Sequence, residues 1–235
     1  MDQPDLSRRR LLGLATAGTA ALAAAPLTGW PLWALPRPRW PIPPDLTPDQ
    51  ALALLYAGNQ RFVEGHIEAP HRNLERLKAV APKQAPFAAV LGCADSRVPV
   101  ELVFDQGFGD LFVARVAGNL LDAAIIGSLE YGCLVLGARV VLVLGHSNCG
   151  AVSAAIEGKA VPGQISTLYQ HLEPAVSSAN GDLATATTNN VRIQAELLAR
   201  SSPVIGGLIK DGKVKVAGGV YDLDSGKVTP VDVRA

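Results

Sequence analysis

Two short apolar runs, each followed at once by residues that commonly bind metals, constrain this chain more than any other feature. Residues 87–92 and 140–145 contain only Phe, Ala, Val, Leu and Gly, as expected of buried strands. Cys93 follows the first run, and His146 with Cys149 follows the second. A stretch of helical character comes after each motif. Because ligands bind at the carboxyl ends of strands in an open parallel sheet, we expect both segments to deliver their side chains to one point.

Cys93, His146 and Cys149 are donor types that a zinc ion prefers, and three protein ligands leave one coordination position open for chemistry. Cys149 would stand at the start of a helix, where free N–H groups favour a thiolate. The sequence therefore predicts a catalytic zinc site. A closed structural zinc site or two buried free cysteines are the alternatives, but a closed site usually needs a fourth Cys or His ligand, and the sequence offers none nearby.

Asp95 and Arg97 follow Cys93 at intervals of two residues. Asp95 is close enough in sequence to reach the metal or a water bound to it. Arg97 can hold that carboxylate through two parallel hydrogen bonds. An aspartate fixed in this way stays ionised and accepts a proton from the bound water, so we predict a catalytic dyad of Asp95 and Arg97.

The remainder of the chain alternates expected strands with expected helices. This order indicates an α/β fold in a single domain, with a central, mainly parallel β-sheet flanked by helices. Cys133 is expected to be a small buried apolar residue in one of the helices. We expect helices over 47–65, 122–136 and 185–200, and late strands over 213–221 and 227–233 joined by a turn at 224–226.

Residues 91–99 and 144–151 resemble the two zinc motifs of the β-class carbonic anhydrases. The resemblance runs from about Thr47 to the C-terminus, and its motifs are specific. The other segments that match the family pattern are 57–62, 109–119, 128–132 and 219–222.

The resemblance implies a function and the residues that perform it. Cys93, His146 and Cys149 match the zinc ligands, and Asp95 with Arg97 matches the catalytic dyad. Zinc-bound hydroxide would attack CO2 to give bicarbonate and a proton. The cleft in this family lies at a dimer interface, so a homodimer or a dimer of dimers is expected. The residues that match its substrate-binding positions are Gln84, Phe112, Tyr131 and Gly150.

The family has two resting forms, which differ in where the aspartate lies. In the closed form Asp95 would be a fourth zinc ligand, and in the open form it pairs with arginine. Val90 stands where the closing subgroup carries a Trp, although Arg115 and Tyr221 match that subgroup's bicarbonate pocket. Because Gln84 is present as well, we predict the open form.

Two other functions stay open from the sequence. A related zinc hydrolase acting on carbonyl sulfide or carbon disulfide would use the same site, and the depth and lining of the cleft would distinguish it. A non-catalytic zinc- or bicarbonate-binding protein would most easily arise by loss of the dyad. A cysteine hydrolase leaves Cys93 unexplained. The 21 basic and 21 acidic residues form no basic stripe that would indicate nucleic acid.

The N-terminal residues 1–34 are typical of an export signal. Three arginines after Ser7 precede an apolar, Ala-rich run that extends to about Leu27. The adjacent arginines fit the twin-arginine version, so we expect a periplasmic or secreted protein, with an uncleaved membrane anchor as the alternative. A Pro-rich arm over 35–46 follows, and the expected catalytic domain occupies 47–235.

Overall fold

The structure is a computed structural model that describes residues 45–234. Five strands form the centre of its fold. The predicted export signal and nearly all of the Pro-rich arm lie outside the described residues. The sheet order is β2-β1-β3-β4-β5; the first four strands run parallel and β5 is antiparallel to β4. The bounds are β1 (Ala88–Gly92), β2 (Leu111–Arg115), β3 (Val140–His146), β4 (Lys215–Tyr221) and β5 (Val228–Val231).

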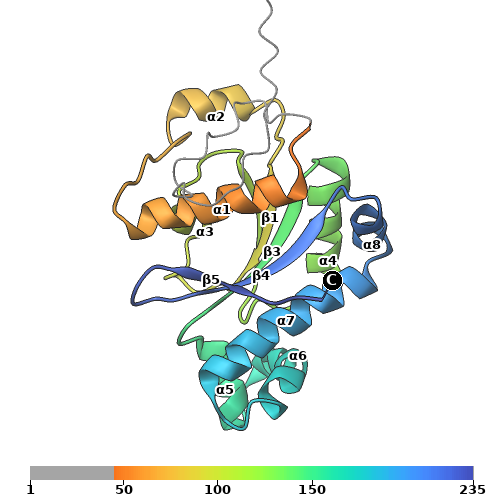
Figure 1. Ribbon diagram of the computed structural model, residues 1–235. Helices are drawn as coiled ribbons and strands as arrows, with labels where there is room; N and C mark the ends of the chain where they lie inside the picture. Colours follow the sequence, from red (N-terminus) through yellow and green to blue (C-terminus); the bar gives the residue numbers. More distant parts are fainter. Residues whose placement is uncertain (1–44, 235) are drawn as a thin grey trace, which may run out of the picture. The chain divides into compact units, whose positions relative to one another are not determined.

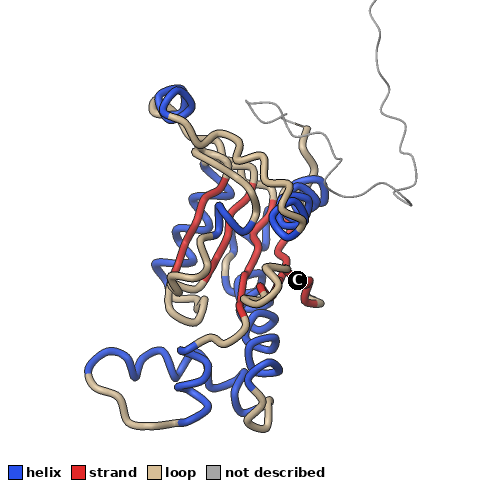
Figure 2. Tube along the Cα trace, turned by 90° about the vertical axis from the view of Figure 1, so that its left-hand side faces the viewer, coloured by secondary structure: helices blue, strands red, loops and turns tan. Residues whose placement is uncertain are grey.

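Helices cover both faces of this sheet, which confirms the predicted α/β class (Figure 1). Helices α1 and α3 pack on one face, and α4, the π-helical turn η2, α7 and α8 pack on the other. Helices α5 and α6 lie beyond the carboxyl ends of the strands, and α2 lies at the opposite end (Figure 2). Among the described residues, no helix combines the length and apolar character needed to span a bilayer. The bounds are α1 (Pro48–Val63), α2 (Leu74–Val80), α3 (Val100–Val103), α4 (Ala123–Glu130), η2 (Tyr131–Val135), α5 (Gly150–Glu157), the 3₁₀ turn η3 (Gly163–Ile165), α6 (Ser166–Ser177), α7 (Leu183–Ser201) and α8 (Pro203–Lys210).

The two apolar runs form the central strands β1 and β3, as predicted. Both strands are buried along their whole length because helices cover both faces of the sheet. They are neighbours and run parallel, with Gly92 opposite Leu144. Cys93 and His146 therefore leave the sheet at the same end.

The predicted helices form, with one local difference. Helix α1 begins with the expected capping box between Thr47 and Gln50. The helix predicted over 122–136 starts at the Asp122 cap, but its last turn is a π-helix rather than an α-helix. Here Gly132 lies so close to Phe112 that a Cβ atom would come within 2.9 Å of the aromatic ring. The late strands are shorter than predicted by a few residues at their ends.

Helix α7 packs closely on the sheet at two glycines, which make room for one of its side chains. Val191 is fully buried, and its two methyl groups lie over Gly145 of β3 and Gly218 of β4. A Cβ atom would come within 2.5 Å of Val191 Cγ2 at Gly145 and within 2.8 Å of Val191 Cγ1 at Gly218. The close approach fixes α7 directly behind the segment that carries His146.

Candidate metal centre

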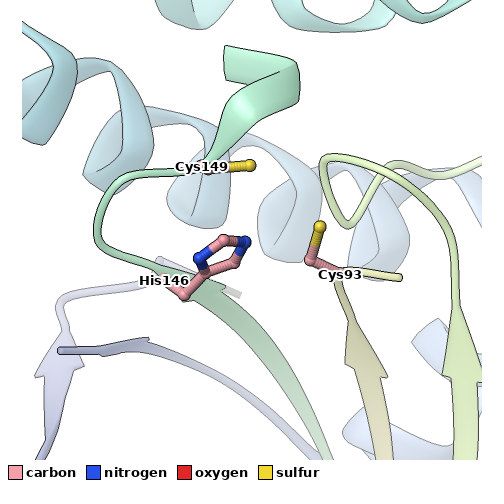
Figure 3. A group of neighbouring side chains, drawn as sticks. All are labelled: Cys93, His146 and Cys149. Atoms are coloured by element: carbon pink, nitrogen blue, oxygen red, sulfur yellow. The ribbon is translucent and has the colours of Figure 1, made fainter. Parts of the chain in front are cut away.

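Cys93, His146 and Cys149 converge at the carboxyl end of the sheet, as predicted. Their ligand atoms all lie within 4.8 Å of one another. The side chains point toward a common position from three elements: the end of β1, the last residue of β3 and the cap of α5 (Figure 3). The three residues are 4%, 0% and 1% exposed, respectively. Such a buried group of two sulfurs and one imidazole suits a zinc ion.

The orientation of the His146 ring leaves one nitrogen available to a metal. Nδ1 lies 2.9 Å from the Ser147 carbonyl oxygen, so Nδ1–H donates a hydrogen bond there. Nε2 is buried and has no hydrogen-bond partner among the described residues. A backbone acceptor on one imidazole nitrogen commonly fixes the tautomer in which the other binds metal. The residues present therefore fit a metal ion.

The two cysteines interact directly, and their acidities differ as a result. A hydrogen bond from Cys149 lowers the pKa of Cys93 to about 4, and the Gly118 N–H adds to this effect, lying 3.3 Å from Cys93 Sγ. The same interaction, together with burial, raises the pKa of Cys149 above its ordinary value. Backbone N–H groups at the start of α5 lower the pKa of Cys149, as predicted, but the interaction with Cys93 raises it by more. Burial lowers the pKa of His146, but interactions with the nearby Cys93 thiolate raise it by more, so the net pKa lies above its ordinary value.

Asp95 and Arg97 form a bidentate ion pair beside the three ligand residues. Arg97 Nε donates to Asp95 Oδ1 at 3.0 Å and Arg97 Nη2 donates to Oδ2 at 2.8 Å, while the Arg97 backbone N–H also reaches Oδ1 at 2.9 Å. The Arg97 guanidinium holds the pKa of Asp95 well below its usual range. Asp95 Oδ2 lies 3.8 Å from His146 Nε2. This pairing is the one expected of the open form, which stays a prediction for the zinc-loaded protein, as does the catalytic role of the dyad.

Arg115 supports the loop that carries these residues, a role that the sequence reasoning missed. It is the last residue of β2, and it donates from Nε to the Cys93 carbonyl oxygen at 2.9 Å and from Nη2 to the Asp95 carbonyl oxygen. Its register partner is Gly92, directly before Cys93. Tyr221, the other residue matched to a bicarbonate pocket, is buried at the end of β4 opposite His146.

The predicted substrate-binding residues divide into two groups. Gly150 is the first residue of α5, next to Cys149. Phe112 and Tyr131 contact each other with ring centroids 6.4 Å apart, and Phe112 pairs with Ala89 near the start of β1. Gln84 is exposed before β1 begins.

Gln84, Phe112 and Tyr131 form the second group. Within one chain they do not lie beside Cys93, His146 and Cys149. Cys93 follows the end of β1, and a strand of that length spans about 16 Å. Gln84 therefore lies at the opposite end of the sheet from Cys93, and Phe112 and Tyr131 lie along the β2 edge. Their role in lining a substrate cleft stays a prediction. Cys133, by contrast, is buried as a small residue in the helical layer, and burial raises its pKa to about 12.

Comparison with known proteins gives consistent similarities. A family model described as carbonic anhydrase matches residues 88–228. Carbonic anhydrase 2 of Mycobacterium tuberculosis is 35% identical over 192 residues, covering 78% of this chain and 93% of that protein. The carbonic anhydrase of Mycolicibacterium smegmatis is 36% identical over 195 residues, covering 79% and 94%. The solved Coccomyxa β-carbonic anhydrase in complex with acetazolamide is similar with a TM-score of 0.60 and 26% identity, covering 74% and 82%.

Proposed function

Since the chain belongs to the β-class carbonic anhydrase family, we propose that it catalyses the reversible hydration of CO2 to bicarbonate and a proton with one zinc ion as cofactor. The observation that carries this proposal is the buried convergence of Cys93, His146 and Cys149 beside an ionised carboxylate. A soft, three-ligand donor set with an adjacent hydrogen-bond acceptor is the composition of a catalytic rather than a structural zinc site.

The three convergent side chains would hold the ion through two Sγ atoms and His146 Nε2. When bound, zinc supplies a Lewis acid that lowers the pKa of water from 15.7 to about 7, so that hydroxide is available at neutral pH. The polypeptide must then exclude competing ligands and orient the nucleophile. Burial of all three ligand residues serves the first purpose.

Asp95 serves the second purpose. Arg97 donates two hydrogen bonds to Oδ1 and one to Oδ2, so the carboxylate has one fixed orientation. Oδ2 is the carboxylate atom that the structure places near His146 Nε2, where it can accept a hydrogen bond from a nucleophile bound beside the ligands. Because the pKa of Asp95 is low, its carboxylate is better suited to accepting a hydrogen bond that orients the nucleophile than to taking up a proton from it, the role expected from the sequence.

The surface next to β2 supports assembly as a homodimer. Tyr131, Leu134 and Val135 of η2 are 46%, 59% and 61% exposed, and exposed apolar patches of this kind mark interaction sites. A second copy on this surface would bury the patch. In the arrangement that the family resemblance implies, lining residues come from the partner subunit, so Gln84, Phe112 and Tyr131 of one subunit would line the metal site of the other. Analytical ultracentrifugation of Leu134→Glu tests this proposal, because a variant that stays dimeric would contradict it.

Export through the twin-arginine pathway to the periplasm or beyond is proposed from the pattern of residues 1–34. This route carries folded proteins, so the metal would be acquired before export and the two cysteines would be protected from oxidation. Replacing Arg8 and Arg9 by Lys should leave the protein in the cytoplasmic fraction. Unchanged export of that variant would count against the proposal.

Stopped-flow hydration of CO2 by the zinc-loaded protein tests the proposed activity directly. We expect catalysis at about pH 7 to pH 9, where zinc makes hydroxide available. Asp95→Asn is the matched variant, since it keeps the shape of the side chain and removes its charge. No hydration above the buffer rate would refute the proposal, and hydrolysis of carbonyl sulfide in its place would favour the related zinc hydrolase.

A further inference from the structure

A row of polar side chains on α7 is buried behind the metal centre. Thr187, Asn190 and Gln194 are three and four residues apart, which places them on one face of the helix. All three are almost completely buried. Burying amide groups costs free energy unless they are hydrogen-bonded, so the partners of Asn190 and Gln194 indicate what these two residues do.

The two amides of this row bind the loop that follows β2. Asn190 Nδ2 donates to the Gly118 carbonyl oxygen at 2.8 Å, and the Leu121 backbone N–H donates to Gln194 Oε1 at 3.0 Å. Gln194 Nε2 donates in turn to Asn190 Oδ1 at 3.2 Å. The linked amides therefore hold the loop at two points, one of which is the residue that reaches the metal centre.

Gly118 connects this network to a metal-binding residue. Its N–H lies 3.3 Å from Cys93 Sγ, while its carbonyl oxygen accepts from Asn190 on the other side. The backbone here is in the left-handed region at two consecutive positions, with φ of +78° at Gly118 and +46° at Asn119. A non-glycine residue adopts this conformation at an energetic cost, so it needs surrounding contacts that hold it in place.

We propose that Asn190, supported by Gln194, is a positioning residue of the metal centre that keeps the Gly118 N–H directed at the Cys93 sulfur. This inference rests on the proposed zinc site. A hydrogen bond to a thiolate ligand stabilises its charged form and fixes its direction. Partners of this outer kind typically change metal affinity about 10- to 100-fold when they are removed.

Asn190→Asp is the sharpest test because it keeps the shape of the side chain. In its ionised form the new carboxylate oxygen would face the Gly118 carbonyl oxygen without a proton to share, while an acceptor for Gln194 is retained. We expect the variant to bind zinc about tenfold or more weakly than the wild type and to lose zinc faster to a chelator. In cobalt-substituted protein we expect a shift of the thiolate-to-cobalt charge-transfer band. Asn189→Asp is the matched control, since the adjacent Asn189 bonds Ser178 and Arg192 and not the loop.

Two further variants separate positioning from general destabilisation. Gln194→Met leaves Asn190 in place and removes its support, so it should shift the cobalt band in the same direction by a smaller amount. Leu198→Ala, in the apolar core on the same helix, should lower the melting temperature without shifting the band.

The outcomes distinguish this inference from the function on which it rests. An unchanged cobalt band and unchanged zinc release in both Asn190→Asp and Gln194→Met, with normal metal binding by the wild type, would overturn the positioning role alone. A wild-type protein that binds neither zinc nor cobalt would overturn the proposed function as well. A shifted band in Asn190→Asp but not in Asn189→Asp or Leu198→Ala supports the inference.

Discussion

The close packing of α7 on Gly145 gives a quantitative prediction about the segment that carries His146. In Gly145→Ala the new methyl group would lie 2.5 Å from Val191 Cγ2 and 3.3 Å from Thr187 Cγ2, whereas carbon atoms normally approach to about 3.5–4.0 Å. Val191 is fully buried and its other methyl group lies over Gly218, so it has little room to move aside. Overpacking of this kind costs about 1–3 kcal/mol.

Urea unfolding of a double-mutant cycle measures this effect. Val191→Ala alone should destabilise by about 2 kcal/mol, because it removes buried methyl groups and leaves a small cavity. Combining Val191→Ala with Gly145→Ala removes the clash between the two side chains. The double variant should therefore lose less free energy of unfolding than the two single variants lose together, by about 1 kcal/mol or more. Gly207→Ala in α8 is the control, because its Cβ would meet nothing within 4 Å. A neutral Gly145→Ala or strictly additive free energies of unfolding would refute the reasoning.

Three further substitutions test separate parts of the account. Asp95→Asn should lower kcat for CO2 hydration about 100-fold or more, with zinc content by atomic absorption unchanged, and loss of the metal would contradict the orienting role. Hydrogen bonds from Thr185 hold the pKa of Asp182 below its ordinary value, so the charged cap stabilises the fold above about pH 4 and this stabilisation is lost as the pH falls. Asp182→Asn should therefore flatten the dependence of Tm on pH below about pH 5, and an unchanged slope there would contradict this linkage. Asp105→Ala would remove the partner 2.8 Å from the buried Arg61 and should cost about 3–5 kcal/mol in urea unfolding; a loss below about 1 kcal/mol would argue against the buried pair.

The secondary structure that local signals specify was predictable from the sequence. Uninterrupted apolar runs predicted β1 and β3, and the Thr47 capping box predicted where α1 begins. Helix α8 was not predicted, because two adjacent glycines in only eight residues weaken its helical signal. The π-helical turn at Tyr131 packs against Phe112, a contact that no local pattern indicates.

The convergence of Cys93, His146 and Cys149 was predictable because these residues come at or just after the ends of two strands, and strands of a parallel sheet end together. The residues that support them were not, because they come from distant parts of the chain. Arg115 reaches Cys93 across 22 positions, and Asn190 reaches Gly118 across 72. Such partners become visible only after the sheet and α7 are assembled. Gln84 is the opposite case. The family resemblance predicts it as a substrate-binding residue, but within a single chain it lies at the end of the sheet away from Cys93.

The most direct test of the account is zinc K-edge X-ray absorption on purified protein of known metal content. The account predicts one zinc ion per chain with two sulfur neighbours at about 2.3 Å, and nitrogen and oxygen neighbours at about 2.0–2.2 Å. Cys93→Ser should reduce the sulfur count to one. A coordination shell of nitrogen and oxygen alone, or active protein without metal, would contradict the central claim that Cys93, His146 and Cys149 together bind one ion.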